Sequence, residues 1–324
     1  MSSTRREWLQ AARERLSRSE VEAAHLVAQV LLAEALRVSR VALLAHDDLP
    51  LAPAELAAAE AYLQRRLDGD SLAYTVGHVE FLDVDLRVSP AVLVPRNETE
   101  LVVQRAAQAL GGHIPASDVF RVVDVGTGSG AIALGLAKLI PAARVVAIDC
   151  STDALRVAHL NRRRLGLSER VALVVGDGLA PLATPTPGNG QSVTEPHAAA
   201  AALQRVWGAT GPWHGLVDLV VSNPPYVDPA EAPTLRREVL REPHVALFAG
   251  APGAGGLAFH TRLLHEAPDW LRPGGWLVLE LGHGQAEVLK QLVQRDPRWI
   301  APAEITADWA GIERVLAVQR AAAY

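Results

Sequence analysis

The amino-acid sequence predicts an α/β fold, namely a doubly wound, mostly parallel sheet preceded by a small bundle of helices. From residue 121 onward, short apolar runs rich in β-branched residues alternate with stretches of helical period. Such alternation is typical of parallel strands that helices cover on both faces, with right-handed connections. The expected strands are 122–125, 145–148, 171–175, 216–221 and 276–281, and the expected helices are 131–139, 153–165 and 258–271.

The first 74 residues show a different pattern, and we expect them to form a separate domain of three or more short helices. Apolar residues such as Trp8, Ala12 and Leu16 recur at helical spacing, and Pro53 stands where a third helix would begin. Residues 75–100 contain glycine, proline and alternating apolar side chains, which predicts a β-hairpin that joins two domains. Residues 101–324 then form the domain of the sheet.

One segment of the second domain departs from the alternation of strand and helix. Residues 184–215 are rich in Pro, Gly, Thr and Ala, and only 198–202 favour a short helix. We expect a surface excursion between the third and fourth strands. A lid over a substrate is the alternative.

The composition narrows the class of protein. Among 324 residues the formal net charge is −5, which argues against binding nucleic acid mainly through bulk electrostatics. Two arginine clusters, 162–164 and Arg236, Arg237 and Arg241, are interpreted as solvated helix faces. Cys150 is the single cysteine and the histidines are scattered, so we expect neither a disulfide nor a bound metal. No apolar run reaches the ~20 residues that span a bilayer, so a soluble, cytoplasmic protein is expected.

A glycine-rich turn follows the first expected strand and opens the next helix. Gly126, Gly128 and Ala131 fit the dinucleotide pattern GxGxx[GA], and the acidic Asp149 follows about 20 positions later. Glycine permits a positive φ and lets a ligand approach the backbone. On these residues alone, an NAD enzyme and a methyltransferase that uses S-adenosylmethionine are both open. Asp124 favours the methyltransferase, because loops that hold the methionine part of that cofactor commonly read [DE]xGxGxG.

Two carboxylates follow the second and third strands, where a cofactor would cross the sheet. Asp149 can accept hydrogen bonds from both hydroxyls of a ribose, and the alternative is that it caps the next helix. Asp177 and Gly178 would flank the adenine, and the alternative is a simple turn made from Gly-Asp-Gly.

The fourth strand ends in Asn223, Pro224, Pro225 and Tyr226, and these residues indicate the chemistry. Consecutive prolines make a stiff turn whose carbonyl groups are not drawn into a helix. The Asn223 side chain and the Pro224 carbonyl can accept from an NH₂ group, while the Tyr226 ring can stack on a planar acceptor. Such a site would orient an amide or aromatic amine nitrogen toward a methyl group by positioning and electrostatics, without a strong base. The alternative is an ordinary turn at the end of a strand.

With these motifs the sequence resembles the HemK/PrmC family, the protein-(glutamine-N5) methyltransferases that modify peptide chain release factors. The resemblance covers nearly the whole chain, and its segments are 43–51, 75–81, 88–100, 124–130, 223–226 and 308–314. Three features depart from the family pattern. Asn97 stands in place of a usual proline, Gly178 in place of a frequent aromatic residue, and the segment after Asp177 is longer than usual.

The resemblance implies a class I, Rossmann-like fold and S-adenosyl-L-methionine as the cofactor. It also implies transfer of a methyl group to the side-chain amide of a glutamine in the Gly-Gly-Gln motif of release factors, which tunes translation termination. The helical domain, 1–74, would help to grip this protein substrate, with no nucleic-acid substrate and no membrane. The residues implied at the cofactor are Gly126, Thr127, Gly128, Ser129, Gly130, Asp149, Gly178 and Asn223, and those at the glutamine are Asn223, Pro224, Pro225 and Tyr226.

Three rival functions are open. A related enzyme that methylates a ribosomal protein shares the tetrapeptide 223–226, but its hairpin typically reads Pro-Arg-Ser-Pro. A DNA adenine-N6 methyltransferase also uses the tetrapeptide, but would normally carry a target-recognition domain and a basic cleft. A non-enzymatic scaffold with the cofactor fold is the third. Glu98 and Glu100 are candidate catalytic carboxylates, and we favour instead a structural network between the domains with Arg96.

Overall fold

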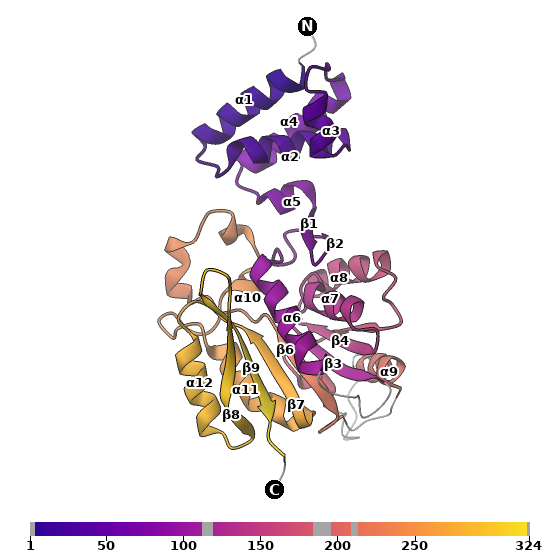
Figure 1. Ribbon diagram of the computed structural model, residues 1–324, viewed down its shortest axis with the longest axis vertical. Coiled ribbons are helices and arrows are strands. Elements are labelled where there is room, and N and C mark those ends of the chain that lie inside the picture. Colours follow the sequence, from indigo (N-terminus) through magenta and orange to yellow (C-terminus); the bar gives the residue numbers. More distant parts are fainter. Residues whose placement is uncertain (1–3, 112–118, 184–195, 209–212, 323–324) are drawn as a thin grey trace. The chain divides into compact units, whose positions relative to one another are not determined.

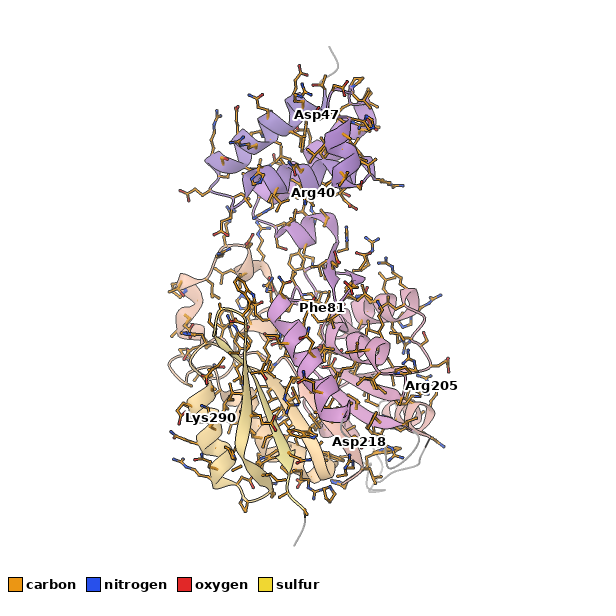
Figure 2. All side chains as sticks on the ribbon, viewed as in Figure 1. Arg40, Asp47, Phe81, Arg205, Asp218 and Lys290 are labelled. Atoms are coloured by element: carbon orange, nitrogen blue, oxygen red, sulfur yellow. The ribbon has the colours of Figure 1, made fainter. Side chains whose placement is uncertain are left out.

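The computed structural model describes residues 4–111, 119–183, 196–208 and 213–322, which fold into two compact units (Figure 1). The helical unit comprises Met1–His78 and Arg236–Arg241. The sheet unit comprises Val79–Leu235 and Glu242–Tyr324. Each unit has its own buried apolar core, and Figure 2 shows the side chains that fill both.

The helical unit confirms the predicted bundle. Its helices are α1 (Arg5–Arg18), α2 (Ala24–Leu36), α3 (Arg40–Ala45), α4 (Pro53–Leu67) and α5 (Leu72–Val76). At the start of α1, the Thr4 hydroxyl accepts from the Glu7 N–H at 3.2 Å, and the Glu7 carboxylate accepts from the Thr4 N–H at 2.8 Å. This reciprocal pair satisfies backbone donors that a helix end leaves free. Trp8, Leu16 and Leu31 lie in the buried core of the unit.

A short segment from far along the chain belongs to the helical unit. We call residues 236–241 the strap. Its ion pairs are Arg236–Glu22, Glu238–Arg66 and Arg241–Asp70, at 2.8, 2.7 and 3.0 Å. The interpretation of Arg236 and Arg241 as simply solvated was therefore incomplete, because their acidic partners lie 214 and 171 positions away in the sequence.

The predicted hairpin is present and consists of β1 (His78–Phe81) and β2 (Val84–Arg87). Leu82 and Asp83 form its two-residue turn with positive φ values of 47° and 57°. This conformation matches the twist of a tight hairpin. The side chain of Asn161 fastens the hairpin to the sheet unit, because it accepts from the Arg87 N–H at 2.8 Å and donates to the Arg87 carbonyl at 2.9 Å.

The sheet confirms the doubly wound, mostly parallel architecture. Its strands are β3 (Phe120–Val125), β4 (Ala143–Asp149), β5 (Val171–Val175), β6 (Val217–Ser222), β7 (Leu271–Glu280), β8 (Trp299–Ala307) and β9 (Glu313–Arg320). They lie in the order β5-β4-β3-β6-β7-β9-β8, and only the pairings of β9 are antiparallel. The chain moves outward from β3 to β5 and then returns to place β6 beside β3. The strand order therefore reverses between β3 and β6, where ligands of open α/β sheets bind.

Helices cover both faces of this sheet (Figure 1). They are α6 (Asn97–Gly111), α7 (Ala131–Leu139), α8 (Thr152–Arg164), α9 (Pro196–Trp207), α11 (Ala258–Trp270) and α12 (Ala286–Arg295). The short helix α10 (His244–Leu247) lies between β6 and α11 in the sequence. The hairpin, α6 and α7 pack into one core, and α9, α11 and α12 pack into the other. Helix α6 begins inside the segment expected to be a linker, so residues 97–100 form its first turn. Among the described helices, none combines the length and the apolar character needed to cross a membrane.

Helix α9 corrects the expectation for residues 184–215. Residues 184–195 and 209–212 of that segment lie outside the described residues. Residues 196–207, however, form a helix rather than a surface excursion, and Leu203, Val206 and Trp207 are buried in the core. The Trp207 indole Nε1 donates to the Arg144 carbonyl at 2.9 Å. The short helix expected at 198–202 lies within α9, whose large apolar residues are confined to its last turns.

Candidate functional site

A pocket of about 420 Å³ opens in the sheet unit where β3, β4, β5 and β6 end. It brings together most of the site residues predicted from the sequence: Gly126, Thr127, Gly128, Ser129, Asp149, Asp177, Gly178, Asn223 and Pro225. Four others do not line it, namely Asp124, Gly130, Pro224 and Tyr226. Within the described part of the chain, no cluster of His, Cys, Asp and Glu is placed to hold a metal.

The first four residues of the glycine loop, residues 126–130, form one wall of the pocket. A Cβ added at Gly126 or Gly128 would meet no atom within 4 Å, so both residues face open space. Their positive φ values of 72° and 56° also favour glycine, which adopts this conformation without steric cost. Gly130 differs, because its Cβ would lie 2.9 Å from the Leu134 side chain. The first two glycines thus leave room for a ligand, and the third allows α7 to begin tightly packed.

Asp124 lies beneath the glycine loop rather than in the pocket wall. The side chain is fully buried, and its Oδ2 accepts from the Thr127 hydroxyl at 2.6 Å and from the Ala133 N–H at 3.1 Å. Burial raises the pKa of Asp124 to about 7, and the hydrogen bond from Thr127 opposes that rise. The structure therefore places Asp124 as a support that holds the loop onto the start of α7.

Asp149 ends β4 and reaches the pocket. Its two carboxylate oxygens accept from the Gly128 N–H at 2.8 Å and the Ser151 N–H at 2.9 Å. Burial raises its pKa, and the hydrogen bonds from Ser151 and Gly128 act against that rise. The Ser151 hydroxyl caps α8 by accepting from the Ala154 N–H at 3.1 Å. Asp149 is therefore not the cap of this helix, and each of its oxygens keeps a lone pair for a ligand.

Arg262 lines the pocket near Asp177 and Gly178, and no sequence pattern singled it out. Its guanidinium binds Asp177 Oδ1 at 2.7 Å and Glu266 at 2.8 Å, and it lies 5.7 Å from the centre of the Phe259 ring. A Cβ added at Gly178 would lie 2.6 Å from Arg262 Nη2. Arg262 thus fills the space that a side chain at position 178 would enter. The departure of Gly178 from the family pattern was the only sequence signal for this exchange.

Asn223 projects into the opposite end of the pocket, directly after β6. Its amide Nδ2 donates to the Thr99 hydroxyl at 3.2 Å. Its Oδ1 is buried and has no hydrogen-bond partner in the described structure. An unpaired buried acceptor is costly, and such groups mark positions where a ligand supplies the missing donor. Pro225 lines the pocket next to Asn223, whereas Pro224 is buried behind it.

Tyr226 is held rigidly by the loops around it. Its carbonyl accepts from Gln285 Nε2 at 3.0 Å, and a Cβ added at Gly256 would lie only 2.0 Å from this oxygen. Its hydroxyl donates to Glu280 Oε1 at 3.3 Å. Burial and the nearby Glu280 carboxylate raise the pKa of Tyr226, so the phenol stays protonated. Only glycine at position 256 permits this approach of the two backbones.

The carboxyl group of Asp228 fixes the chain just after the tetrapeptide. It accepts from the N–H groups of Ala230, Gly253 and Gly255, at 2.8, 2.8 and 2.7 Å. These backbone donors hold its pKa below the usual value. Asp228 thus ties the loop that contains Gly256 to the turn that contains Tyr226.

The expected network of Arg96 with Glu98 and Glu100 is replaced by other pairs. Arg96 forms an ion pair with the buried Glu242, and Glu100 accepts from the Leu82 N–H at 2.9 Å. Arg96 and Glu242 both belong to the sheet unit. Sequence reasoning missed Glu242 because it lies 146 positions from Arg96.

The fold and the site together define a class I methyltransferase. The two open glycines, the carboxylate at the end of β4 and the unpaired Asn223 oxygen share one pocket at the switch point of the sheet. Residues 116–184 match a methyltransferase domain, and residues 7–77 match the PrmC N-terminal domain. This class uses S-adenosylmethionine, so the NAD alternative is set aside.

Relatives across almost the full chain specify the family. The release factor glutamine methyltransferase of Moorella thermoacetica is 38% identical over 318 residues, which are 98% of this chain and 99% of that protein. That of Geobacter sulfurreducens is 37% identical over 86% of this chain and 84% of that protein. The chain therefore belongs to the release factor glutamine methyltransferase family. Among solved structures, the hMettl16 catalytic domain in complex with an RNA hairpin of the MAT2A 3′UTR has a TM-score of 0.50 at 17% identity. It covers 82% of this chain and 79% of that chain, a likeness of fold alone.

Proposed function

We propose that this protein transfers a methyl group from S-adenosyl-L-methionine to the side-chain nitrogen of a glutamine in peptide chain release factors. The observation that carries the proposal is Asn223 Oδ1, a buried acceptor without a partner at the pocket. The NH₂ group of a glutamine side chain would supply the missing hydrogen bond. Because release factors act on the ribosome, the cytoplasm is the proposed place of action.

The cofactor would occupy the part of the pocket between the glycine loop and Arg262. Gly126 and Gly128 leave room for it, and Asp149 has free lone pairs for two ribose hydroxyls. Arg262 would cover the adenine in place of the aromatic side chain that is frequent at position 178, since a guanidinium also stacks on a flat ring. When bound, the cofactor supplies a methyl group on a positively charged sulfur.

The acceptor glutamine would lie against Asn223 and the carbonyl of Pro224. Both oxygens would accept from the glutamine NH₂ and favour the positive charge that develops on nitrogen as it is alkylated. The glutamine nitrogen would receive the methyl group that the cofactor supplies, the sulfur would remain with the demethylated cofactor, and one amide proton would leave to solvent. We expect positioning and electrostatics to carry this chemistry without a strong base.

The helical unit is proposed to recognise the protein substrate, with residues 1–74 as the recognition domain, 75–100 as the linking region and 101–324 as the methyltransferase domain. Its core is separate from that of the sheet unit, so it is not needed to build the pocket described above. A folded protein substrate requires a contact surface larger than a single side chain, which a second domain can provide.

The test is incubation with isotopically labelled S-adenosylmethionine and, in separate reactions, a release factor, ribosomal proteins or duplex DNA. Mass spectrometry of the products locates the methyl group. A methyl on the glutamine of the Gly-Gly-Gln motif supports the proposal. A methyl found only on a ribosomal protein or on adenine would overturn the substrate, and no binding of the cofactor would favour a scaffold.

A further inference from the structure

The orientation of the Asn223 amide decides what the site can bind. A side-chain amide presents an oxygen on one side and an NH₂ group on the other, and its terminal torsion is close to two-fold. The acceptor site needs the oxygen to face the glutamine. If the amide turned over, its NH₂ would face the glutamine NH₂, and two sets of donors would oppose each other.

Thr99 determines which way the amide points. Its hydroxyl lies 2.7 Å from Glu280 Oε2 and 3.2 Å from Asn223 Nδ2. A hydroxyl has one hydrogen to donate. Since a carboxylate can only accept, Thr99 gives its hydrogen to Glu280 and must accept from Asn223. The NH₂ of Asn223 therefore faces Thr99, and Oδ1 points away from it.

Glu280 binds the hydroxyl groups of Thr99 and Tyr226 through its carboxylate. It ends β7, is 1% exposed, and accepts from Thr99 through one oxygen and from the Tyr226 hydroxyl through the other. The charged groups near it are Glu98 of α6 and Arg314 of β9, and the His260 ring of α11 hydrogen-bonds to its backbone carbonyl. Burial raises the pKa of Glu280 to about 7, and the hydrogen bonds from Thr99 and Tyr226 act against that rise.

We propose that Thr99 and Glu280 are positioning residues that lock the Asn223 amide with its oxygen toward the acceptor glutamine. The inference rests on the proposed function and adds two residues to it. We call the hydrogen-bonded series Asn223–Thr99–Glu280 the relay. Both residues act through Asn223. Thr99 lines the pocket, whereas Glu280 does not. When Glu280 is a carboxylate, the directions of all three hydrogen bonds are fixed. When Glu280 is protonated, the Thr99 hydroxyl is free to donate to Asn223 instead, and the amide loses its preferred orientation.

The kinetic test compares Thr99→Val with Thr99→Ser. Valine keeps the shape of threonine but removes the hydroxyl, whereas serine keeps the hydroxyl. In single-turnover methyl transfer to a release factor, we expect Thr99→Val to lower the rate about 10-fold or more, as for the loss of one pre-positioned group. Affinity for S-adenosylmethionine should stay within about 2-fold, and Thr99→Ser should keep most of the rate. A wild-type rate in Thr99→Val, or equal losses in both variants, would overturn the relay.

The pH dependence separates positioning from packing. The wild-type rate should rise as the pH increases through about 7, because the carboxylate form of Glu280 is the one that fixes the relay. In Thr99→Val, Asn223 no longer senses Glu280, so this step in the profile should disappear. The same step in both proteins would contradict the inference.

A measurement without turnover keeps the inference distinct from the proposed function. The chain contains four asparagines, so selective ¹⁵N labelling gives few side-chain NH₂ signals, and Asn223→Ala identifies the one of interest. Hydrogen exchange of the Asn223 NH₂ should be about 10-fold faster or more in Thr99→Val and unchanged in Thr99→Ser. If wild-type protein methylates no glutamine but shows this pattern, the proposed function fails and the relay stands. Equal exchange in all variants would overturn the relay itself.

Discussion

The two ends of the pocket are built in different ways. At the cofactor end, backbone N–H groups and glycines form the wall, and the contact from Gly128 to Asp149 joins residues 21 positions apart. At the acceptor end, side chains hold one another, and the contacts from Asn223 to Thr99 and from Thr99 to Glu280 span 124 and 181 positions. The first end depends on local backbone geometry, whereas the second depends on the finished fold. Substitutions at the acceptor end should therefore lower mainly the rate of methyl transfer, and substitutions at the cofactor end mainly the affinity for the cofactor.

The largest effect is expected from Asn223→Ala at the acceptor end. The variant loses an acceptor whose interaction strengthens as charge develops on nitrogen, so kcat should fall by about 10²-fold or more. Cofactor affinity should change little, because Asp149 and the glycine loop are untouched. Single-turnover transfer to a release factor measures the loss. The control is Asn97→Ala, the same substitution at an exposed site. A wild-type rate for Asn223→Ala would contradict the proposed chemistry.

Asp149→Ala should affect the cofactor end instead. Losing hydrogen bonds from ribose hydroxyls to a carboxylate should weaken S-adenosylmethionine binding by about 1–3 kcal/mol. Titration calorimetry with S-adenosylmethionine and its demethylated product measures this change, and the rate at saturating cofactor should fall much less. Asp153→Ala, on the exposed face of α8, is the control. If the affinity of Asp149→Ala is unchanged, the ribose is bound elsewhere.

Arg262→Ala gives a smaller effect that tests the exchange with Gly178. Loss of a guanidinium over the adenine should lower cofactor affinity by about 3- to 10-fold, within the range of cation–π contacts. Calorimetry with the demethylated cofactor measures it without turnover, and Arg156→Ala on the surface is the control. Unchanged affinity would show that Arg262 only pairs with Asp177 and Glu266.

The smallest effect is expected from Glu238→Gln in the strap. Glu238 pairs with Arg66, whose side chain is 11% exposed, so this pair is shielded from water and its loss should lower the free energy of unfolding by about 1 kcal/mol. Glu22→Gln is the control, because the Glu22–Arg236 pair is exposed and should contribute little. Urea unfolding followed by circular dichroism measures both. Equal losses of unfolding free energy in the two variants would mean that burial of the Arg66–Glu238 pair adds nothing to its contribution.

The sequence was most informative where neighbours along the chain decide the structure. The parallel strands, helices α7, α8 and α11, and the glycine loop all follow from local periodicity and glycine spacing, and the structure places them as predicted. The tetrapeptide after β6 is equally local. Its rigid backbone could be anticipated from two prolines, although the support from Gln285 and Gly256 could not.

The sequence was least informative where distant residues meet. Helix α6 was not expected, because the segment that contains its start matched a hairpin pattern, and Thr99 therefore had no assigned place. Glu280 reads as the end of a buried strand, and only the parallel register of β6 and β7 brings it near Asn223 and Tyr226. Arg262 reads as half of an ordinary helical pair with Glu266. The periodicity of apolar residues carries no information on contacts between residues so far apart in the sequence.

Because of the strap, the polypeptide cannot be separated into its two units by a single cut. The polypeptide passes between the helical unit and the sheet unit at three points, after residues 78, 235 and 241. A cut at any single point leaves one of the two units incomplete. A chimera that exchanges the helical unit between two members of the family must therefore carry residues 236–241 together with the N-terminal helices. The two units are each compact, but the segments of sequence that form them alternate along the chain.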